Sequence, residues 1–300
     1  MGNADDAGEE YAHWEFAAVL QSTVDEVDAI ASRGGSGYHI PTGFHALDDL
    51  TGGLRRGSLT VVGAHPGVGS STLASDFIRG AAVRHGVASA YLTLDDTAEA
   101  VTQRLLCAVN KIRLADMRTG RMTDKGWTRL AKGVSAIHEK LVVITRLGDP
   151  DIAAVEDAVA SLTAAQDTQL VIVDSLHMVT ARRDVLYENR EREVAEVTRR
   201  LKRLALDHNI AVVATVQLSC NSGPRQPVMP APSLADLRDS GTIAHVADNV
   251  LLIHRPDAWD RDDPRAGEAD LILAKHRHGP TATFLLVQQF LYGRFITLAI

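Results

Sequence analysis

The sequence predicts an α/β fold with a mostly parallel sheet that is flanked by helices and ends in antiparallel edge strands. Between about residues 58 and 216, short runs rich in β-branched residues alternate with longer runs of helical periodicity. This alternation is typical of a parallel sheet that is covered on both faces. After Val246 the apolar runs follow one another closely, which predicts antiparallel strands added to the sheet edge.

The same periodicity gives the individual elements of the domain. The predicted core strands are 58–64, 88–94, 141–145, 169–174 and 210–216. The predicted helices are 71–85, 97–110, 123–140, 151–165 and 188–208. The predicted edge strands are 249–254, 269–275, 283–288 and 294–300. All of them belong to one predicted domain, 38–300, because a single α/β core can absorb most of a chain of this length.

Residues 1–37 are predicted to form an appendage of three parts: an acidic tip, an amphipathic helix and a glycine-rich tether. Apolar residues recur at helical spacing between His13 and Ser32, which predicts one helix with an apolar stripe. The glycines at 34, 35 and 37 end this helix and make the connection to the domain flexible. The stripe must pack either on its own domain or on a neighbouring subunit, and the sequence leaves both alternatives open.

Composition excludes several classes of protein. The chain has 300 residues, of which 45% are hydrophobic and 23% charged, as in ordinary globular proteins and unlike disordered or collagen-like chains. No apolar stretch approaches the roughly 18 residues of a membrane span. The acidic first residues lack the basic and apolar parts of a secretory signal, so we expect a cytoplasmic protein without membrane contact.

Charge and cysteine content exclude further classes of protein. The formal net charge of −7 argues against a protein that binds nucleic acid over its whole surface, although it leaves room for a local basic channel. Two cysteines, Cys107 and Cys220, are too few for a disulfide framework or a four-cysteine zinc site. We therefore expect reduced cysteines that serve in packing.

A glycine-rich turn between the first core strand and the first core helix is the strongest chemical signal. Its candidate phosphate-binding residues are Ala64, His65, Pro66, Gly67, Val68, Gly69, Ser70, Ser71 and Thr72. In such a turn, consecutive backbone N–H groups point at a phosphate and the helix N-terminus adds partial positive charge. The position in the chain is that of a P-loop, the phosphate-binding loop of many NTPases, and the alternative is a tight turn without a ligand.

The turn departs from the P-loop consensus G-x-x-x-x-G-K-[ST] at two positions. Ala64 takes the place of the first glycine and Ser70 the place of the lysine, whereas Ser71 keeps the magnesium-binding hydroxyl. The lysine neutralises phosphate oxygens and stabilises the charge of the transition state. Losing such a charge commonly costs about two to three orders of magnitude in rate, so we expect weak nucleotide binding and impaired hydrolysis.

A second signal is the hydrophobic run 170–173, which ends in Asp174. In P-loop proteins, a carboxylate at the end of such a strand helps to hold Mg²⁺. Alone it is only a polar strand terminus, but together with the glycine-rich turn it predicts a nucleotide site. Ser71 and Asp174 are the predicted magnesium-binding residues.

Beyond these two motifs, the chain resembles the C-terminal motor domain of DnaB-type replicative helicases, the RecA-like ring ATPases of helicase superfamily 4. The resemblance covers nearly all of 40–295. It is carried by Pro41-Thr42-Gly43-Phe44, Leu47-Asp48, Thr51-Gly52-Gly53-Leu54, Asp174, 189–197, Gln217-Leu218-Ser219, 233–241 and 274–281.

This resemblance implies roles for further residues. Gln217 would sense the γ-phosphate, and Asp95 stands where the family has the glutamate that orients the attacking water. Lys275 and Arg277 stand where the family has a lysine and an arginine finger that reach into the ATP of a neighbouring subunit, and a solvated strand edge is the alternative for both. The resemblance therefore implies ATP or another NTP with Mg²⁺, and a homo-oligomer, a hexameric ring in the family.

Other departures from the family pattern predict weaker ATP hydrolysis and weaker DNA binding than in the family. The carboxylate of Asp95 is one methylene shorter than that of the family's glutamate. In 220–232, the counterpart of the loop that contacts DNA in the family's central channel, only Arg225 keeps a basic residue. Since lysine and arginine contacts to phosphates supply most non-specific DNA affinity, we expect weak binding of single-stranded DNA. Residues 1–37 resemble only the family's linker helix and not the helical domain that precedes it.

Two functions remain open from the sequence. The first is a DnaB-like ring motor that translocates on or unwinds DNA in replication, with ATP hydrolysis impaired by Ser70 and Asp95. The second is a catalytically inactive nucleotide-binding or scaffold paralogue that assists or regulates another DnaB-type helicase. Gln217, Lys275 and Arg277 favour the first function, and the altered P-loop and channel loop favour the second.

Overall fold

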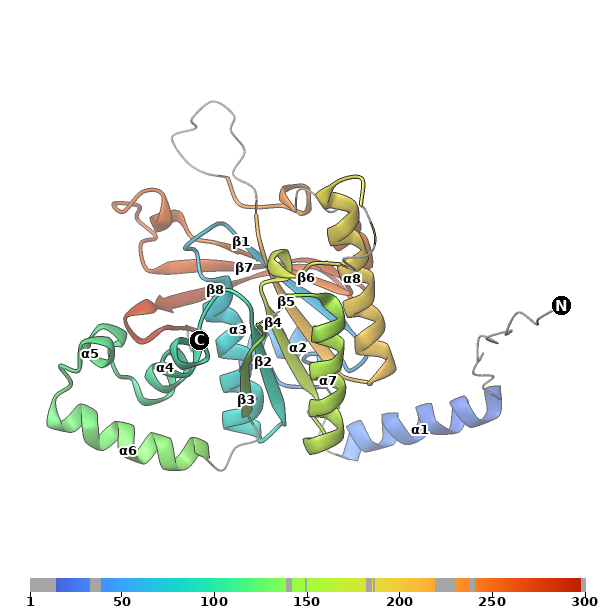
Figure 1. The fold of residues 1–300 in the computed structure, drawn as a ribbon, viewed down its shortest axis with the longest axis horizontal. Helices are drawn as coiled ribbons and strands as arrows, with labels where there is room; N and C mark the ends of the chain where they lie inside the picture. Colours follow the sequence, from blue (N-terminus) through green and yellow to red (C-terminus); the bar gives the residue numbers. More distant parts are fainter. Residues whose placement is uncertain are drawn as a thin grey trace. The chain divides into compact units, whose positions relative to one another are not determined.

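The computed structural model describes residues 15–32, 39–138, 142–148, 150–181, 185, 187–218, 230–237 and 241–297 (Figure 1). The chain divides into two compact units, Met1–Tyr38 and His39–Ile300. In the first unit, the predicted amphipathic helix is observed as α1 (Phe16–Ser32). The predicted acidic tip and tether lie outside the described residues.

The second unit is built on a nine-stranded sheet with the order β3-β2-β4-β5-β1-β6-β7-β8-β9. The strands are β1 (Leu59–Ala64), β2 (Ser89–Thr93), β3 (Val142–Arg146), β4 (Leu170–Asp174), β5 (Ala211–Gln217), β6 (Asn249–His254), β7 (Glu268–His276), β8 (Ala282–Gln289) and β9 (Arg294–Thr297). Strands β1 to β6 run parallel, and β7, β8 and β9 continue the sheet antiparallel. The predicted α/β class with antiparallel C-terminal strands is confirmed.

One strand of the predicted antiparallel tail runs the other way. β6 pairs in parallel with β1, with Thr60 opposite Asn249 and Ala64 opposite Ile253. A short helix, α9 (Gly241–Val246), precedes β6. This helix lies in the crossover that brings the chain back to the edge at which the parallel strands begin. β6 therefore runs in the same direction as β1. Six residues are too few for helical periodicity to be recognised in the sequence, and α9 was not predicted.

The helices of the second unit are mostly those that the sequence predicts. They are α2 (His45–Thr51), α3 (Ser70–Ile78), α4 (Ala98–Asn110), α5 (Leu114–Thr119), α6 (Asp124–His138), α7 (Ile152–Gln166), α8 (Arg190–Asp207) and α9. Short 3₁₀ segments are η2 (Leu176–Met178), η3 (Leu234–Asp236), η4 (Pro256–Ala258) and η5 (Phe290–Tyr292). The short helices α2 and α5 were not predicted. None of the described helices has the length and apolar character needed to cross a membrane.

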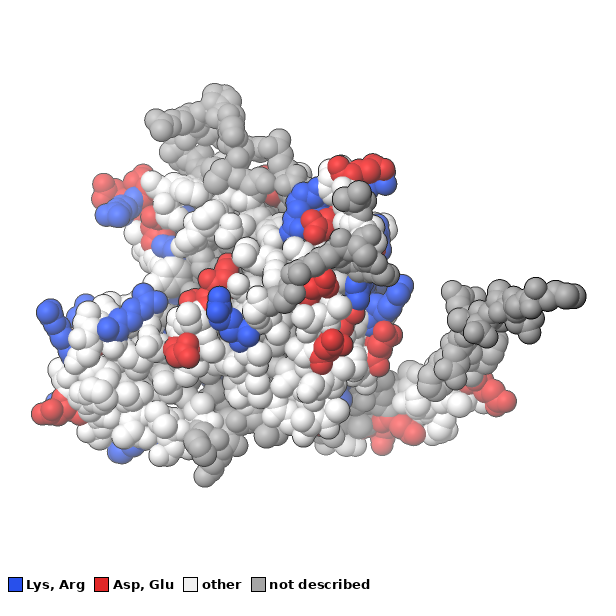
Figure 2. Space-filling view, viewed as in Figure 1, with Lys and Arg blue, Asp and Glu red and all other residues white. Residues whose placement is uncertain are grey.

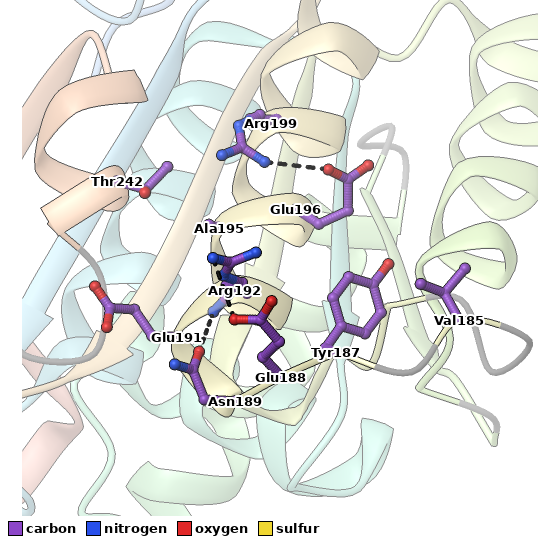
Figure 3. A pocket seen from close by; sticks show the side chains of 10 residues that line it. All are labelled: Val185, Tyr187, Glu188, Asn189, Glu191, Arg192, Ala195, Glu196, Arg199 and Thr242. Atoms are coloured by element: carbon purple, nitrogen blue, oxygen red, sulfur yellow. Dashed lines mark hydrogen bonds and ion pairs between the residues drawn. The ribbon is translucent and has the colours of Figure 1, made fainter.

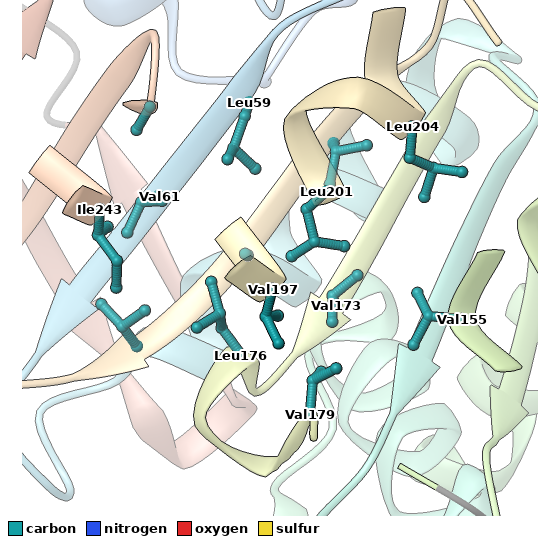
Figure 4. Packing of buried hydrophobic residues seen from close by; sticks show 14 of the residues in the cluster. Leu59, Val61, Val155, Val173, Leu176, Val179, Val197, Leu201, Leu204 and Ile243 are labelled. Atoms are coloured by element: carbon teal, nitrogen blue, oxygen red, sulfur yellow. The ribbon is translucent and has the colours of Figure 1, made fainter. Parts of the chain in front are cut away.

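Two hydrophobic cores lie on the two faces of the sheet, because alternate strand residues point to opposite sides. On one face, Leu59 and Val61 of β1 pack with residues of α7, α8 and α9, such as Leu201 (Figure 4). On the other, Val62 packs with residues of α2, α3 and α4, such as Phe77. Both faces are therefore buried, which explains why the strands are continuously apolar.

The predicted helix 71–85 changes character halfway. After α3 the chain continues as a π-helical segment, η1 (Arg79–Arg84). Within it, Gly80 lies against the loop before α2, and a Cβ atom added at Gly80 would lie 2.1 Å from the carbonyl oxygen of Thr42. This close approach of two backbones requires glycine.

Gly80→Ala is expected to lower the free energy of unfolding by about 3 kcal/mol, because the added methyl group overlaps backbone atoms that cannot move independently. Chemical denaturation of the purified protein measures this change. Gly148→Ala is the matched control, since nothing lies within 4 Å of a Cβ at that exposed glycine. Equal stability of the two variants would contradict the close packing at Gly80.

The edge strand β9 is connected to α3, the helix that begins at the glycine-rich turn. The buried carboxylate of Asp76 accepts hydrogen bonds from Nε of Arg79 at 2.8 Å and from the backbone N–H of Phe295 at 2.6 Å. Burial raises the pKa of Asp76 to about 6, although Arg79 opposes this rise. The position of α3 therefore depends on the last strand of the sheet.

Candidate functional site

Four of the predicted site residues or segments meet at one edge of the sheet, at the carboxyl ends of adjacent strands β2, β4, β5 and β1. Gln217 is opposite Ala64, the last residue of β1 and the first of the glycine-rich turn. Asp174 is opposite Thr93, and Asp95 follows Thr93 by two residues. The carboxyl edge of a parallel sheet is where ligands bind in open α/β folds, so the topology assembles the predicted nucleotide site.

The turn between β1 and α3 has the backbone of a phosphate cradle. Gly67 and Gly69 have φ values of +77° and +123°, which side chains rarely allow. A Cβ at Gly69 would lie 2.9 Å from ring atoms of Phe290 and Phe295. α3 begins at Ser70, directly after this turn. The turn therefore directs the N–H groups of a helix N-terminus to the carboxyl edge, where they fit a phosphate group.

Three hydroxyl groups surround the carboxylate of Asp174, which is buried. Oγ of Ser71 donates to Oδ1 at 3.1 Å, and Oγ1 of Thr215 donates to the same oxygen. The hydroxyl of the buried Tyr91 donates to Oδ2 at 2.5 Å. Oxygen atoms of this kind are the ligands that Mg²⁺ prefers, so the predicted pair Ser71 and Asp174 fits a magnesium ion.

The sequence did not predict the roles of Tyr91 and Thr215. Both lie inside buried strands, β2 and β5, and their polar groups point to the same carboxylate. The available signal was a hydroxyl in an otherwise apolar strand, because a buried polar group needs a hydrogen-bond partner. Burial and the neighbouring Asp174 raise the pKa of Tyr91 well above its usual value, so Tyr91 stays a donor to Asp174.

Tyr91→Phe is expected to lower the free energy of unfolding by about 1–2 kcal/mol, because the charged Asp174 loses a buried donor. Thermal or chemical denaturation at neutral pH measures the change. Tyr187→Phe is the control, since the Tyr187 hydroxyl has no hydrogen bond among the described residues although its ring packs against the core. If both variants unfold alike, Tyr91 does not support Asp174.

Three described cations lie near the turn, and the first two, Arg79 and His65, are not available to a phosphate. Arg79 points to Asp76, and burial lowers the pKa of His65, so this imidazole is neutral at pH 7. Arg255 was not predicted, because it follows β6 far along the chain. Its Nη1 donates to the carbonyl of Gly67 at 3.3 Å, and its guanidinium lies 4.4 Å from the ring centre of Phe290. Arg255 also pairs with Asp257 at 3.0 Å.

Asp95 and Gln217 are exposed at the same edge. Partial burial and repulsion from Asp174 and Asp96 raise the pKa of Asp95 above its usual value, which favours proton uptake by this carboxylate. Asp96 is engaged by Arg104, whose Nη2 lies 2.9 Å from Oδ2. Asp95 is therefore better placed than Asp96 to face a water molecule.

Lys275 and Arg277 lie at the opposite edge of the sheet, where the parallel strands begin. Lys275 is opposite Val250, near the start of β6, and the N–H of Arg277 donates to the carbonyl of Asp248, just before β6. Asp248 adjoins Leu59, the first residue of β1, whereas the glycine-rich turn follows Ala64, the last. At about 3.3 Å per residue, the two ends of β1 are roughly 16 Å apart, so the structure does not bring these cations to the turn of their own chain.

A cleft of about 680 Å³ lies beside the first half of α8 and holds none of the predicted site residues (Figure 3). Both arginines that line it are paired, Arg192 with Glu188 at 3.1 Å and Arg199 with Glu196 at 3.3 Å. On the face shown in Figure 2, basic and acidic side chains of the described residues are interspersed. The predicted DNA contact Arg225 lies outside the described residues.

Comparison with known proteins gives a consistent result. Residues 39–297 match the family of the DnaB-like helicase C terminal domain. The replicative DNA helicase DnaB of Leifsonia xyli subsp. xyli is 39% identical over 276 residues, which are 92% of this chain and 60% of that protein. DnaB of Mycobacterium leprae is 45% identical over 232 residues, 77% of this chain and 37% of that protein. The chain thus spans at most 60% of the length of these two relatives.

Two solved structures share the fold. One, described as an ATPase domain, has a TM-score of 0.86 at 22% identity, and the match covers 96% of this chain and 100% of that one. A DnaB-like replicative helicase, solved to show its interactions with primase, has a TM-score of 0.85 at 23% identity, with 95% of this chain and 69% of that one covered. At these identities the likeness concerns the fold alone.

Proposed function

Because the chain belongs to the family of the DnaB-like helicase C-terminal domain, we propose that it is an ATP-binding ring motor that moves on or unwinds DNA in replication and hydrolyses ATP slowly. One observation supports the proposal: at the carboxyl edge, the glycine-rich turn lies beside the hydroxyl groups around Asp174, and Ser70 occupies the position at which the P-loop consensus has lysine. The site is therefore built for a magnesium nucleotide and lacks one charge.

Each residue of the carboxyl edge has a separate role in nucleotide binding or hydrolysis. The backbone N–H groups of the turn 64–72 bind the phosphates, and Ser71 and Asp174 hold Mg²⁺, which neutralises charge on the phosphate oxygens when bound. Asp95 orients the attacking water and takes up its proton. Gln217, at the end of β5, responds to the γ-phosphate. Tyr91 and Thr215 fix the carboxylate of Asp174.

Two residues make the reaction slow. Without a lysine at Ser70, the developing charge on the phosphates has one fewer preorganised partner, which costs about two to three orders of magnitude. Asp95 reaches less far than a glutamate toward the water, and small misplacements of a reacting group are costly. We therefore propose weaker nucleotide binding than in the family and strongly reduced turnover.

We further propose that the working form is a homo-oligomeric ring, a hexamer by family analogy, in the cytoplasm. The support is the separation of the two halves of the site, since Lys275 and Arg277 lie at the sheet edge opposite to the turn. Copies arranged head to tail bring Arg277 to the nucleotide of a neighbour, whereas the ammonium of Lys275 is held by carbonyls of its own chain. Head-to-tail contacts form a ring when the rotation between successive copies closes. Single-stranded DNA would pass through the ring, where Arg225 is the proposed phosphate contact.

A second function is supported by Ser70 itself. A chain that keeps the fold and the cations at the opposite edge, but binds nucleotide poorly, can act as an inactive scaffold or as a regulatory partner of an active DnaB-type helicase. In that case, mixed assembly with such a helicase is expected to matter more than turnover.

Titration with fluorescent ATP and ADP in the presence of Mg²⁺, together with mass determination of the same samples, tests the proposal. Nucleotide binding with nucleotide-dependent hexamers is the result expected of a motor. Absence of binding and of assembly contradicts the motor and favours the scaffold function. ATP turnover at the rate of an efficient helicase contradicts the proposed impairment.

A further inference from the structure

The buried carboxylate of Asp248 lies next to Arg277, at the edge where the parallel strands begin. The side chain of Asp248 is 3% exposed and accepts from three donors. These are the backbone N–H of Leu59 at 2.8 Å, Nζ of Lys202 at 2.7 Å and Nη1 of Arg277 at 2.9 Å. Asp248 thus joins the start of β1, helix α8 and the residue after β7.

From this arrangement we infer that Asp248 is a positioning residue, which orients Arg277 toward the nucleotide of a neighbouring copy. The inference rests on the proposed function, in which Arg277 acts between subunits. Asp248 itself does not touch the nucleotide in this proposal. It acts through Arg277 alone.

The geometry of Arg277 supports this role. Its backbone N–H donates to the carbonyl of Asp248 at 2.9 Å, and Nη1 donates to Oδ1 of the same residue. The side chain nevertheless stays 56% exposed. Because a guanidinium has five N–H donors in a rigid fork, fixing one of them sets the direction in which the others face solvent.

The carboxylate is itself held firmly. Lys202 also donates to the carbonyl of Gly57 at 2.8 Å, so the ammonium connects α8, Asp248 and the start of β1. Hydrogen bonds from Lys202, Leu59 and Arg277 outweigh burial and lower the pKa of Asp248. Asp248 therefore remains charged at neutral pH and holds Arg277 by a charge-assisted hydrogen bond.

Lys275 secures the same segment of chain from the other side. Its Nζ donates to the carbonyls of Ala244, His245 and Ala247, at 2.9, 2.8 and 2.6 Å. These carbonyls lie at the end of α9 and just after it, where a cation is favourable. An ammonium has three donors, and the ammonium of Lys275 uses all three on these carbonyls. The guanidinium of Arg277 keeps donors that can reach a partner. Lys275 thus stabilises the backbone that carries Asp248.

Asp248→Asn tests the inference in the assembled protein, in the natural chain and in a Ser70→Lys background that gives more turnover. We expect kcat to fall about 100-fold, as for a misplaced catalytic group, while fluorescent ATP binds to the variant with nearly unchanged affinity. Asp270→Asn is the matched control, because Asp270, near the start of β7, pairs with Arg265 and not with Arg277. This control should keep the turnover of its parent.

Mixing experiments separate a misplaced Arg277 from a damaged nucleotide site. Asp248→Asn subunits mixed with Asp174→Ala subunits should regain turnover, because one supplies the nucleotide site and the other a well-placed Arg277. Mixing Asp248→Asn with Arg277→Ala should restore nothing. Unchanged kcat in Asp248→Asn, or failure of the first mixture to recover, overturns the inference.

A second variant keeps the test decisive if Asp248→Asn does not assemble. Lys202→Met removes one anchor of the carboxylate and should give a smaller loss of kcat with the same mixing pattern; unchanged kcat or another pattern overturns the inference. Absence of turnover in both the natural chain and Ser70→Lys contradicts the proposed function itself. Turnover that is present but insensitive to Asp248→Asn and Lys202→Met contradicts only the role of Asp248.

Discussion

Replacing Ser70 with lysine is expected to raise ATP turnover by about two to three orders of magnitude and to tighten binding of ATP with Mg²⁺. Ser70 begins α3 directly after Gly69, in the middle of the glycine-rich turn. Among the described cations near this turn, Arg79 points to Asp76 and Arg255 pairs with Asp257, and the imidazole of His65 is neutral. A lysine at this position supplies the charge that the rest of the site lacks. Steady-state ATPase assays and titration with fluorescent ATP, on both proteins under the same conditions, measure the two effects.

Ser70→Met is the matched control for this experiment, because methionine has a similar length and no charge. It should leave turnover and affinity near those of the natural chain. A gain in Ser70→Met equal to that in Ser70→Lys would mean that packing, and not charge, limits the site. Unchanged affinity in Ser70→Lys would show that the turn 64–72 is not a phosphate cradle.

Part of the carboxyl edge can be predicted from the sequence because the features that mark it are local. A glycine-rich turn between a strand and a helix, and an apolar run that ends in Asp174, are each visible within about ten residues. The parallel sheet then brings them together, since strands that run in one direction end at one edge. Asp174 is placed near the turn by its own motif, whereas Asp95 and Gln217 are placed there by the resemblance to the DnaB-type motor domain.

Contacts between distant segments could not be predicted in this way. The hydrogen bond from Tyr91 to Asp174 joins residues 83 positions apart, and that from Arg255 to Gly67 joins residues 188 apart. The direction of β6 depends on the short helix α9, which leaves no periodic signal. The close approach of Gly80 to Thr42 depends on how η1 packs, and a single glycine inside a helical pattern does not reveal it.

Removing the side chain of Arg277 is expected to have the other large effect. In the Ser70→Lys background, Arg277→Ala should lower turnover by about three orders of magnitude or more, the usual contribution of an arginine supplied by a neighbour to phosphoryl transfer. ATPase assays on the assembled protein measure this loss. Arg261→Ala, which removes an exposed arginine from the turn between η4 and β7, is the control and should leave turnover unchanged.

The stability and binding of Arg277→Ala decide whether the residue acts between copies. Since Arg277 is more than half exposed and Asp248 keeps Lys202 and Leu59 as donors, the free energy of unfolding should change by less than about 1 kcal/mol. The chain diluted below its assembly concentration should bind fluorescent ATP as well as its parent, because Arg277 lies at the edge opposite to its own turn. If dilute Arg277→Ala loses nucleotide affinity, Arg277 serves the site of its own chain, and the separation of the two edges no longer supports a ring.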